Sequence, residues 1–249
     1  MLIQQTLSQM RFLRLNAMAE AFDQQRDRPE LQTLSFEDRF AMLVETECLA
    51  RDSRRINRLL KTAKLKFNAA PEDIDYRDSR GLDRRQVASL LGCDWIGRGQ
   101  NLIVTGPTGA GKTWLTCAFG VQAIRRAHVV AYRRLPRLLE EIEIAREDGS
   151  LPKLRAQFAK TKLLILDDWG VVKLTARGRQ DLLEVVDDRV GTQSLSVAIT
   201  SQIPVVDWHT YLGDPTIADA IMDRIVHNAH RIELKGESMR KRMGKLGDA

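Results

Sequence analysis

The spacing of the hydrophobic positions changes along this chain. Between residues 3 and 22, apolar side chains recur about every 3.6 residues, which predicts an amphipathic helix. Ser35 and Asp38 have the spacing of a capping box, so a second helix is expected to begin at Phe36 and to run to about Phe67. These two helices predict a small all-helical domain at the start of the chain.

Short apolar runs and helical segments alternate in the rest of the chain. The polar stretch 68–75, which contains Pro71, is typical of a linker and divides an N-terminal domain of residues 1–67 from a second domain of residues 76–249. The expected strands lie at residues 102–104, 128–132, 163–166, 195–200 and 230–234. The expected helices lie at residues 84–91, 114–126, 135–146, 151–159, 180–190 and 216–226. Such alternation predicts an α/β domain, in which helices cover both faces of a parallel sheet.

Composition narrows the class of protein. Hydrophobic residues make up 43% of the 249 positions, which is enough for a packed core. No apolar run reaches the length of a membrane span, and the first residues lack the pattern of a signal peptide. The three cysteines match no zinc or disulfide spacing, which predicts reduced thiols in a cytoplasmic protein without membrane contact. The formal net charge of +6 favours a polyanionic partner, but only weakly.

An eight-residue stretch after the first expected strand carries the strongest chemical signal. It follows the G-x-x-x-x-G-K-[ST] pattern of a phosphate-binding loop placed between a strand and a helix. Its glycines let backbone N–H groups surround phosphate oxygens, while Lys112 adds a positive charge and Thr113 offers a hydroxyl to Mg²⁺. The pattern predicts a nucleotide site formed by Gly106, Pro107, Thr108, Gly109, Ala110, Gly111, Lys112 and Thr113.

Acidic and polar residues follow two later strands. Asp167 and Asp168 come directly after the apolar run 163–166, where a phosphate-loop enzyme holds its metal ion. Asp167 is expected to hold Mg²⁺, directly or through water, and Asp168 to polarise the attacking water. The next strand ends in Thr200, Ser201 and Gln202. Because ligands gather at the carboxyl ends of parallel strands, this group is expected to sense the γ-phosphate, although the pattern leaves open which of the three makes contact.

Together these motifs resemble the AAA+ ATPases of the DnaA/DnaC-like clade, and most closely the IstB-type transposition helper ATPases of insertion sequences. The matching stretches are residues 106–113, 163–170, 200–204, 221–225 and 236–241. The resemblance implies an AAA+ parallel sheet flanked by helices, with ATP and Mg²⁺ as cofactors. It also implies an ATPase that converts ATP and water to ADP and phosphate.

The resemblance implies roles for two arginines. Arg224 matches the arginine finger that reaches into the site of a neighbouring subunit, and Arg240 matches the second sensor of the γ-phosphate. Asp168 stands where many AAA+ enzymes have glutamate, which predicts slower or partner-dependent activation of water. About fifteen residues follow Leu234, so the helical lid of the family is expected to be reduced or absent.

Three groups of cations are candidates for DNA contact. The first lies on one face of the second expected helix and consists of Arg51, Arg54, Arg55, Arg58 and Lys61, although a solvated helix face is the plainer interpretation. The others are Arg133, Arg134 and Arg137, and Lys173, Arg177 and Arg179. No segment has the pattern of base readout, which predicts sequence-tolerant contact with the backbone of duplex DNA that weakens with salt.

The family resemblance implies a homo-oligomeric ring or spiral that assembles on duplex DNA with ATP between subunits. Such an assembly would help a cognate transposase to choose or activate its target DNA. The nearest alternative is a replicative helicase loader of the DnaC type, since it shares nearly all of these residues. A small-molecule kinase and a nucleotide-gated architectural protein with little turnover are further alternatives. The paired acids argue against the kinase, and the shorter Asp168 leaves the architectural protein open.

Overall fold

The computed structural model describes residues 2–77, 80–190 and 195–236. The chain divides into two compact units, residues 1–58 and residues 59–249, and the boundary falls inside helix α3 (Phe36–Ala63). The sequence-based division at residues 67 and 76 stays a prediction, and two side chains of its expected linker, Ala69 and Ile74, are buried in the second unit. The expectation of a reduced lid concerns residues after Leu234, most of which lie outside the described residues.

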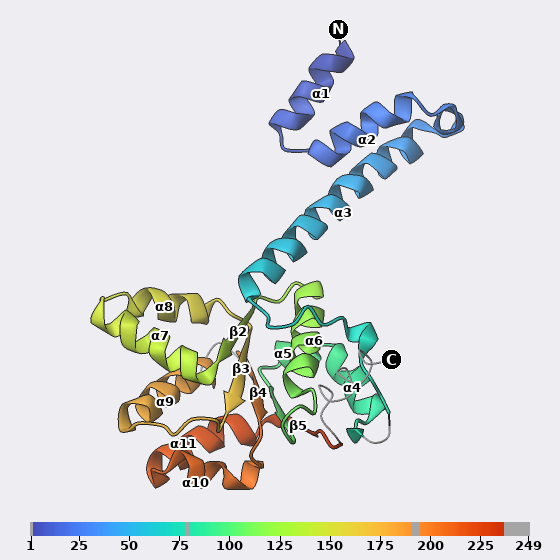
Figure 1. Cartoon of the computed structure of the whole chain (residues 1–249). Coiled ribbons are helices and arrows are strands. Elements are labelled where there is room, and N and C mark those ends of the chain that lie inside the picture. Colours follow the sequence, from blue (N-terminus) through green and yellow to red (C-terminus); the bar gives the residue numbers. More distant parts are fainter. Residues whose placement is uncertain (1, 78–79, 191–194, 237–249) are drawn as a thin grey trace, which may run out of the picture. The chain divides into compact units, whose positions relative to one another are not determined.

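The first unit is helical. It contains α1 (Leu2–Phe12), α2 (Asn16–Arg26), the 3-10 helix η1 (Pro29–Thr33) and the first part of α3 (Figure 1). The prediction of one helix over residues 3–22 is wrong, because Arg14 has a φ of 60° and separates α1 from α2. Helix α3 begins as predicted, with the N–H of Asp38 donating to Ser35 Oγ at 3.1 Å. It ends at Ala63, earlier than predicted, because Lys64 has a φ of 53°.

A buried carboxylate, Glu47 on α3, connects the helices of the first unit. It accepts hydrogen bonds from the N–H of Met18 at 3.1 Å, from Arg51 Nε at 2.9 Å and from Arg54 Nη2 at 3.0 Å. Burial raises the pKa of Glu47, but the hydrogen bonds from Arg51 and Met18 outweigh it and leave that pKa below its ordinary value. The charge of Glu47 is thus held by neighbours on α2 and α3.

The second unit is built on a five-stranded parallel sheet with the strand order β2-β3-β4-β1-β5 (Figure 1). The strands are β1 (Asn101–Thr105), β2 (Val130–Arg134), β3 (Leu163–Trp169), β4 (Ser196–Ser201) and β5 (Ala229–Glu233). Each predicted strand is therefore confirmed within a few residues at its ends, and so is the parallel α/β class.

Helices cover both faces of this sheet. The described helices of the second unit are η2 (Pro71–Asp73), α4 (Arg84–Leu91), α5 (Asp94–Gly97), α6 (Lys112–Arg125), α7 (Leu135–Glu147), α8 (Leu151–Ala159), α9 (Ala176–Val190), η4 (Val205–Asp207), α10 (Trp208–Leu212) and α11 (Pro215–Val226). Alternate strand residues such as Ile103, Leu164 and Val197 pack against α7, α9 and α11. Helix α6 packs on the other face, next to Ile165. The sequence patterns missed the short helices α5 and α10, which are too brief to show a period.

The carboxyl ends of β1, β3 and β4 lie side by side, and this edge carries the polar residues expected there. Strand β3 pairs regularly with β4 as far as Leu166, and the register then shifts before Trp169. Within that shift Asp168 has a φ of 63°. The irregularity turns two neighbouring carboxylates, Asp167 and Asp168, toward different partners.

In the part of the chain that the structure describes, no helix is both long enough and apolar enough to cross a membrane.

Asn101 ties the first strand to helix α11 and to strand β4. Its side chain is 2% exposed, donates to the carbonyl oxygens of Arg224 and Ile225 at 3.1 Å each, and accepts from the N–H of Val197 at 2.9 Å. These bonds satisfy backbone groups at the end of α11 that the helix itself leaves open. Asn101 thereby fixes where the end of α11 lies on the sheet.

We expect Asn101→Ala to lower the free energy of unfolding by about 2–4 kcal/mol, because it leaves three interior backbone groups without partners. Urea unfolding followed by circular dichroism measures this loss. Asn57→Ala, at an exposed position on α3, is the matched control and should change the free energy little. Equal losses in the two variants would contradict the role assigned to Asn101.

Candidate nucleotide site

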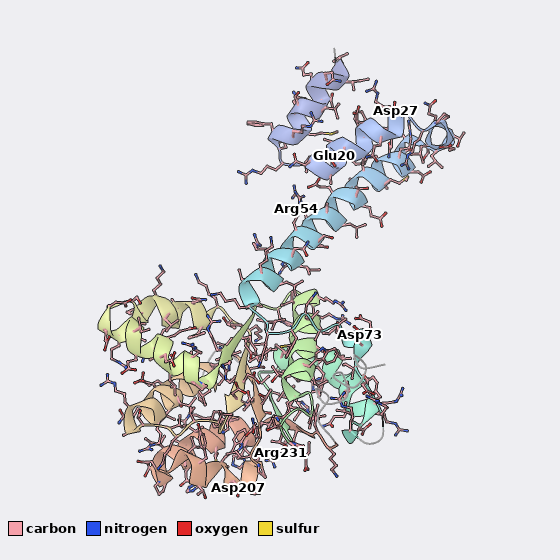
Figure 2. All side chains as sticks on the ribbon, in the orientation of Figure 1. Glu20, Asp27, Arg54, Asp73, Asp207 and Arg231 are labelled. Atoms are coloured by element: carbon pink, nitrogen blue, oxygen red, sulfur yellow. The ribbon has the colours of Figure 1, made fainter. Side chains whose placement is uncertain are left out.

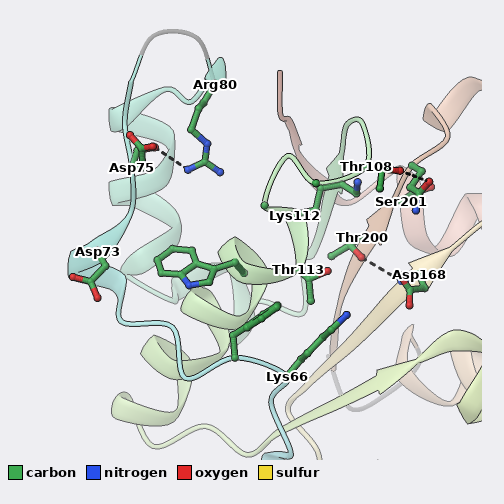
Figure 3. A pocket seen from close by; sticks show the side chains of 15 residues that line it. Lys66, Asp73, Asp75, Arg80, Thr108, Lys112, Thr113, Asp168, Thr200 and Ser201 are labelled. Carbon is green, nitrogen blue, oxygen red and sulfur yellow. Dashed lines mark hydrogen bonds between the residues drawn. The ribbon is translucent and has the colours of Figure 1, made fainter. Parts of the chain in front are cut away.

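A cavity of about 310 Å³ opens at the carboxyl edge of the sheet, next to the predicted phosphate-binding loop (Figure 3). Its lining residues come from the loop after β1, the ends of β3 and β4, the start of α6 and the segment before α4. From the residues predicted for the site they include Thr108, Gly109, Gly111, Lys112, Thr113, Asp168, Thr200 and Gln202. Residues from three separate predicted motifs thus face one cavity.

The loop between β1 and α6 has the backbone of a phosphate cradle. Gly106, Gly109 and Gly111 have φ values of 143°, 84° and 90°, which side-chain-bearing residues rarely adopt. A Cβ on Gly106 would also clash with the carbonyl oxygen of Leu234. The loop leads directly into α6, so the first N–H groups of that helix point at the cavity, where they favour an anion.

Lys112 begins α6 and is 8% exposed. Its Nζ donates to the carbonyl oxygens of Gly106 at 2.8 Å and Pro107 at 2.9 Å, so the ammonium lies across the loop. Burial lowers the pKa of Lys112, while the carboxylates of Asp167 and Asp168 act in the opposite direction. The lysine is therefore placed to meet phosphates that the loop surrounds.

Asp167 is fully buried and is held by three hydroxyl groups. Thr113 Oγ1 donates to Oδ1 at 2.8 Å, Tyr132 OH donates to Oδ2 at 2.5 Å, and Thr200 Oγ1 donates to Oδ1. Burial, together with the hydrogen bond to Asp167, raises the pKa of Tyr132, so the phenol remains a donor. These donors come from α6, β2 and β4, so three separate elements are hydrogen-bonded to the same carboxylate.

The neighbouring oxygens of Thr113 and Asp167 fit a magnesium ion. Mg²⁺ prefers hard oxygen ligands and is usually held by one or two protein groups together with substrate phosphates. Thr113 Oγ1 and Asp167 Oδ1 lie 2.8 Å apart beside the cavity, so the chemistry of this donor set matches that preference. These two residues would hold the ion.

Asp168 points to a different partner from Asp167. Its Oδ2 accepts a hydrogen bond from Arg134 Nε at 2.5 Å, and its N–H donates to Thr200 Oγ1 at 3.3 Å. The hydrogen bond with Asp168 raises the pKa of Arg134. The residue expected to polarise water is therefore paired with one of the cations expected to contact DNA.

The three polar residues at the end of β4 make three different contacts. Gln202 Oε1 accepts from Thr108 Oγ1 of the phosphate-binding loop at 2.8 Å, and Thr200 donates to Asp167. Ser201 Oγ instead donates to the backbone oxygens of Trp169 at 3.1 Å and Ile203 at 3.0 Å. Thr200 is thus joined to the buried carboxylate and Gln202 to the phosphate-binding loop, whereas Ser201 is bonded to the backbone.

Arg224 lies away from this cavity, on α11. Its Nε forms an ion pair with Asp187 of α9, and its Nη1 donates to the carbonyl oxygen of Ala220 at 2.8 Å. The side chain is 34% exposed, so it is accessible from outside the chain. Arg240, the other arginine implied by the family resemblance, lies outside the described residues.

The cations expected to contact DNA differ in their surroundings. Arg51 and Arg54, of which Arg54 is labelled on α3 in Figure 2, pair with Glu47 in the first unit. Arg137 pairs with Glu140, and Arg179 donates to the carbonyl oxygen of Leu174. Arg133 is 9% exposed and donates to Glu141 at 2.8 Å, so its side chain is used in packing within the chain and is little exposed to a DNA partner. Exposed side chains in the three groups include Arg55, Arg58, Lys61, Arg134, Lys173 and Arg177.

Sequence reasoning missed several residues that line the cavity, namely Lys66, Phe67, Asp73, Asp75, Arg80 and Trp114. Arg80 is 5% exposed and donates to the carbonyl oxygen of Ala110 in the phosphate-binding loop at 3.0 Å. All of these except Trp114 lie before β1, at or near the stretch interpreted as a linker. Trp114 could have been predicted to lie at the site, because it directly follows the phosphate-binding motif in the sequence. The other residues belong to no motif that would have identified them.

Comparisons with known proteins agree with this geometry. The family model of IstB-like ATP binding proteins matches residues 8–246. An insertion sequence ATP-binding protein of Sinorhizobium fredii (strain NBRC 101917 / NGR234) is 46% identical over 241 residues, which cover 97% of this chain and 98% of that protein. The ATP-binding protein of insertion sequence IS1162 from Pseudomonas fluorescens is 48% identical over 205 residues, which cover 82% and 88%.

Solved structures show the same fold at low sequence identity. The DnaC helicase loader matches with a TM-score of 0.56 and 17% identity, over 70% of this chain and 100% of that one. AMPPCP-bound DnaA from Aquifex aeolicus matches with a TM-score of 0.55 and 16% identity, over 75% of this chain and 57% of that one. These likenesses show that the chain shares its fold with the DnaC helicase loader and with DnaA.

We expect Lys112→Ala to abolish stabilisation by ATP. A ligand at about 100 times its dissociation constant stabilises a protein by about 2.7 kcal/mol, and loss of this buried ammonium should weaken binding until most of that gain disappears. The measurement is the change in melting temperature on adding MgATP. Lys153→Ala, at an exposed position on α8, should keep the full shift. A normal shift in Lys112→Ala would place the nucleotide elsewhere.

Proposed function

The chain belongs to the IstB-like ATP-binding protein family, and from that premise we propose that it is an ATPase that assembles on duplex DNA and assists a cognate transposase. The observation that carries the proposal is that the phosphate-binding loop and Asp168 line one cavity, while the buried Asp167 is hydrogen-bonded to Thr113 in its lining. ATP binds there, and its hydrolysis yields ADP and phosphate. The assistance consists of choosing or activating the target DNA.

The side chains divide the work of hydrolysis. Lys112 and the start of α6 stabilise negative charge on the phosphates, because both present donors beside the loop. When bound by Thr113 and Asp167, Mg²⁺ would neutralise charge on the outer phosphates. Asp168 orients the attacking water, and Thr200 and Gln202 sense the γ-phosphate through their links to Asp167 and Thr108.

Arg224 acts on the nucleotide of a neighbouring subunit. Its position on α11, outside the cavity of its own chain and 34% exposed, supports a role in trans. A guanidinium matches phosphate oxygens and keeps its charge, so a neighbour's arginine stabilises the charge that develops during hydrolysis. ATP therefore favours a homo-oligomeric ring or spiral, and hydrolysis favours its disassembly.

DNA contact is linked to hydrolysis through Arg134. Its pairing with Asp168 competes with a DNA phosphate that binds at Nε, because Asp168 occupies that donor. A DNA phosphate that draws Arg134 away frees Asp168 to orient water. This competition supports stimulation of the ATPase by duplex DNA, with backbone contacts that tolerate different sequences.

The protein partner separates this proposal from the main alternative. The two insertion-sequence relatives cover most of this chain at 46% and 48% identity, which favours a transposase as partner. The DnaC helicase loader shares the fold at 17% identity, and a loader would bind a replicative helicase instead. A pull-down with each candidate partner distinguishes the two functions.

We expect the wild-type chain to form larger particles with ATP and duplex DNA than without either, and Arg224→Ala to remain small. The variant should bind ATP normally, because Arg224 does not line its own cavity, but lose at least about 100-fold in ATPase rate. Light scattering and phosphate release measure the two effects. Arg231→Ala, an exposed arginine on β5, should behave as wild type. If size and DNA affinity were the same with and without ATP, the proposed assembly would be wrong.

We expect Arg134→Gln to raise the ATPase rate in the absence of DNA and to reduce the stimulation by DNA to less than about twofold. The reason is that Asp168 loses the partner that occupies it. Arg137→Gln is the matched control, because Arg137 pairs with Glu140 and should affect only DNA affinity. Steady-state rates over a DNA titration provide the comparison. A lower DNA-free rate with unchanged stimulation would contradict the link.

A further inference from the structure

Lys66 lies at the nucleotide cavity, although no motif marks it. It lines the same cavity as Lys112 and Thr113, and its Nζ is 3.7 Å from Asp167 Oδ2. In Figure 3 its side chain extends toward the space between Thr113 and Asp168. A second ammonium, besides that of Lys112, therefore lies close to the buried carboxylate.

Packing against α6 fixes the backbone that carries Lys66. Leu65 lies against Gly120, where an added Cβ would be 3.2 Å from Leu65 Cδ2 and 2.9 Å from Ile165 Cδ1. Burial raises the pKa of the Cys117 thiol on α6, and the backbone of Phe67 and Lys66, which lies beside this thiol, partly offsets that rise. Both contacts are with the helix that starts at the phosphate-binding loop, so Lys66 has a defined place relative to that loop.

Asp167 does not need Lys66 for its own burial. Three hydroxyl groups, from Thr113, Tyr132 and Thr200, already donate to its two oxygens. An ion pair in which the lysine is 37% exposed adds little stability, because solvent screens it. A lysine ammonium has three donors, and a carboxylate at 3.7 Å engages at most one of them. The remaining donors are available to a ligand of the cavity.

The charge of the expected ligand matches this arrangement. The ammonium of Lys112 lies across the carbonyl oxygens of Gly106 and Pro107, on the loop side of the cavity. An outermost phosphate held beside Thr113 and Asp167 would have the ammonium of Lys66 close to it. A compact ammonium on a flexible stem suits a phosphate whose position changes when the nucleotide changes.

We propose that Lys66 binds the terminal phosphate of ATP and makes the site prefer ATP over ADP. This inference rests on the proposed ATP site and adds a residue to it. Lys66 follows the end of α3 by only three residues, so the residue that distinguishes ATP from ADP lies next to the connection with the N-terminal helices.

The test is competition of two unlabelled nucleotides against a fluorescent ADP analogue, with Mg²⁺ and the full-length chain. The competitors are ADP and the non-hydrolysable β,γ-methylene analogue of ATP. Lys66→Gln should weaken binding of the triphosphate about tenfold and of ADP less than twofold. Lys66→Arg should keep the preference for the triphosphate within about threefold of wild type, because it keeps the charge. Lys64→Gln, at an exposed position two residues earlier, should behave as wild type.

Results that differ from these expectations would contradict either the role of Lys66 or the ATP site itself. Equal losses for both nucleotides, or no loss for either, would overturn the role of Lys66. If the melting temperature of nucleotide-free Lys66→Gln were well below that of wild type, Lys66 would be a residue that stabilises the fold. That result would also overturn its proposed role in binding ATP. A wild-type chain that binds neither nucleotide would refute the proposed ATP site itself, which is a different failure.

Discussion

The second unit depends on the burial of one carboxylate, Asp167. A fully buried carboxylate is costly unless donors surround it, and here hydroxyl groups from α6, β2 and β4 donate to it. Because those donors belong to three elements, the requirement to satisfy this charge fixes the start of α6 relative to the sheet. The phosphate-binding loop is positioned by the same requirement, since α6 begins where the loop ends.

The register shift at the end of β3 gives the adjacent aspartates separate surroundings. Asp167 faces the interior hydroxyl groups, whereas Asp168, with a φ of 63°, reaches Arg134 at the end of β2. In the proposed function, one strand end thus connects the nucleotide with a candidate DNA contact. Arg224 is paired with Asp187 at the surface of α11, so in the proposed assembly this cation is accessible to a neighbouring subunit.

Sequence patterns predicted the inner strands β1, β3 and β4 well because these strands are buried along nearly their whole length and are rich in apolar residues. They failed where a local backbone conformation or a distant contact decides the outcome. The positive φ of Arg14 divides a segment whose apolar spacing is continuous. Arg133 belongs to a cluster of arginines in the sequence, yet Glu141 and the buried edge of β2 draw it inward. Lys66 and Arg80 reach the cavity from positions just before and just after the stretch 68–75, interpreted as a linker.

Local chemistry in the chain was sufficient to identify the phosphate-binding loop, the paired aspartates and the parallel α/β class. Each of these needs only neighbouring residues and a period, because glycine conformations, strand burial and helix starts are short-range properties. The partners of those residues depend on contacts between segments far apart in the chain. The hydrogen bonds of Tyr132 and Thr200 to Asp167, the pairing of Arg134 with Asp168 and the approach of Lys66 arise only when strands and helices pack together, since no spacing along the sequence encodes them.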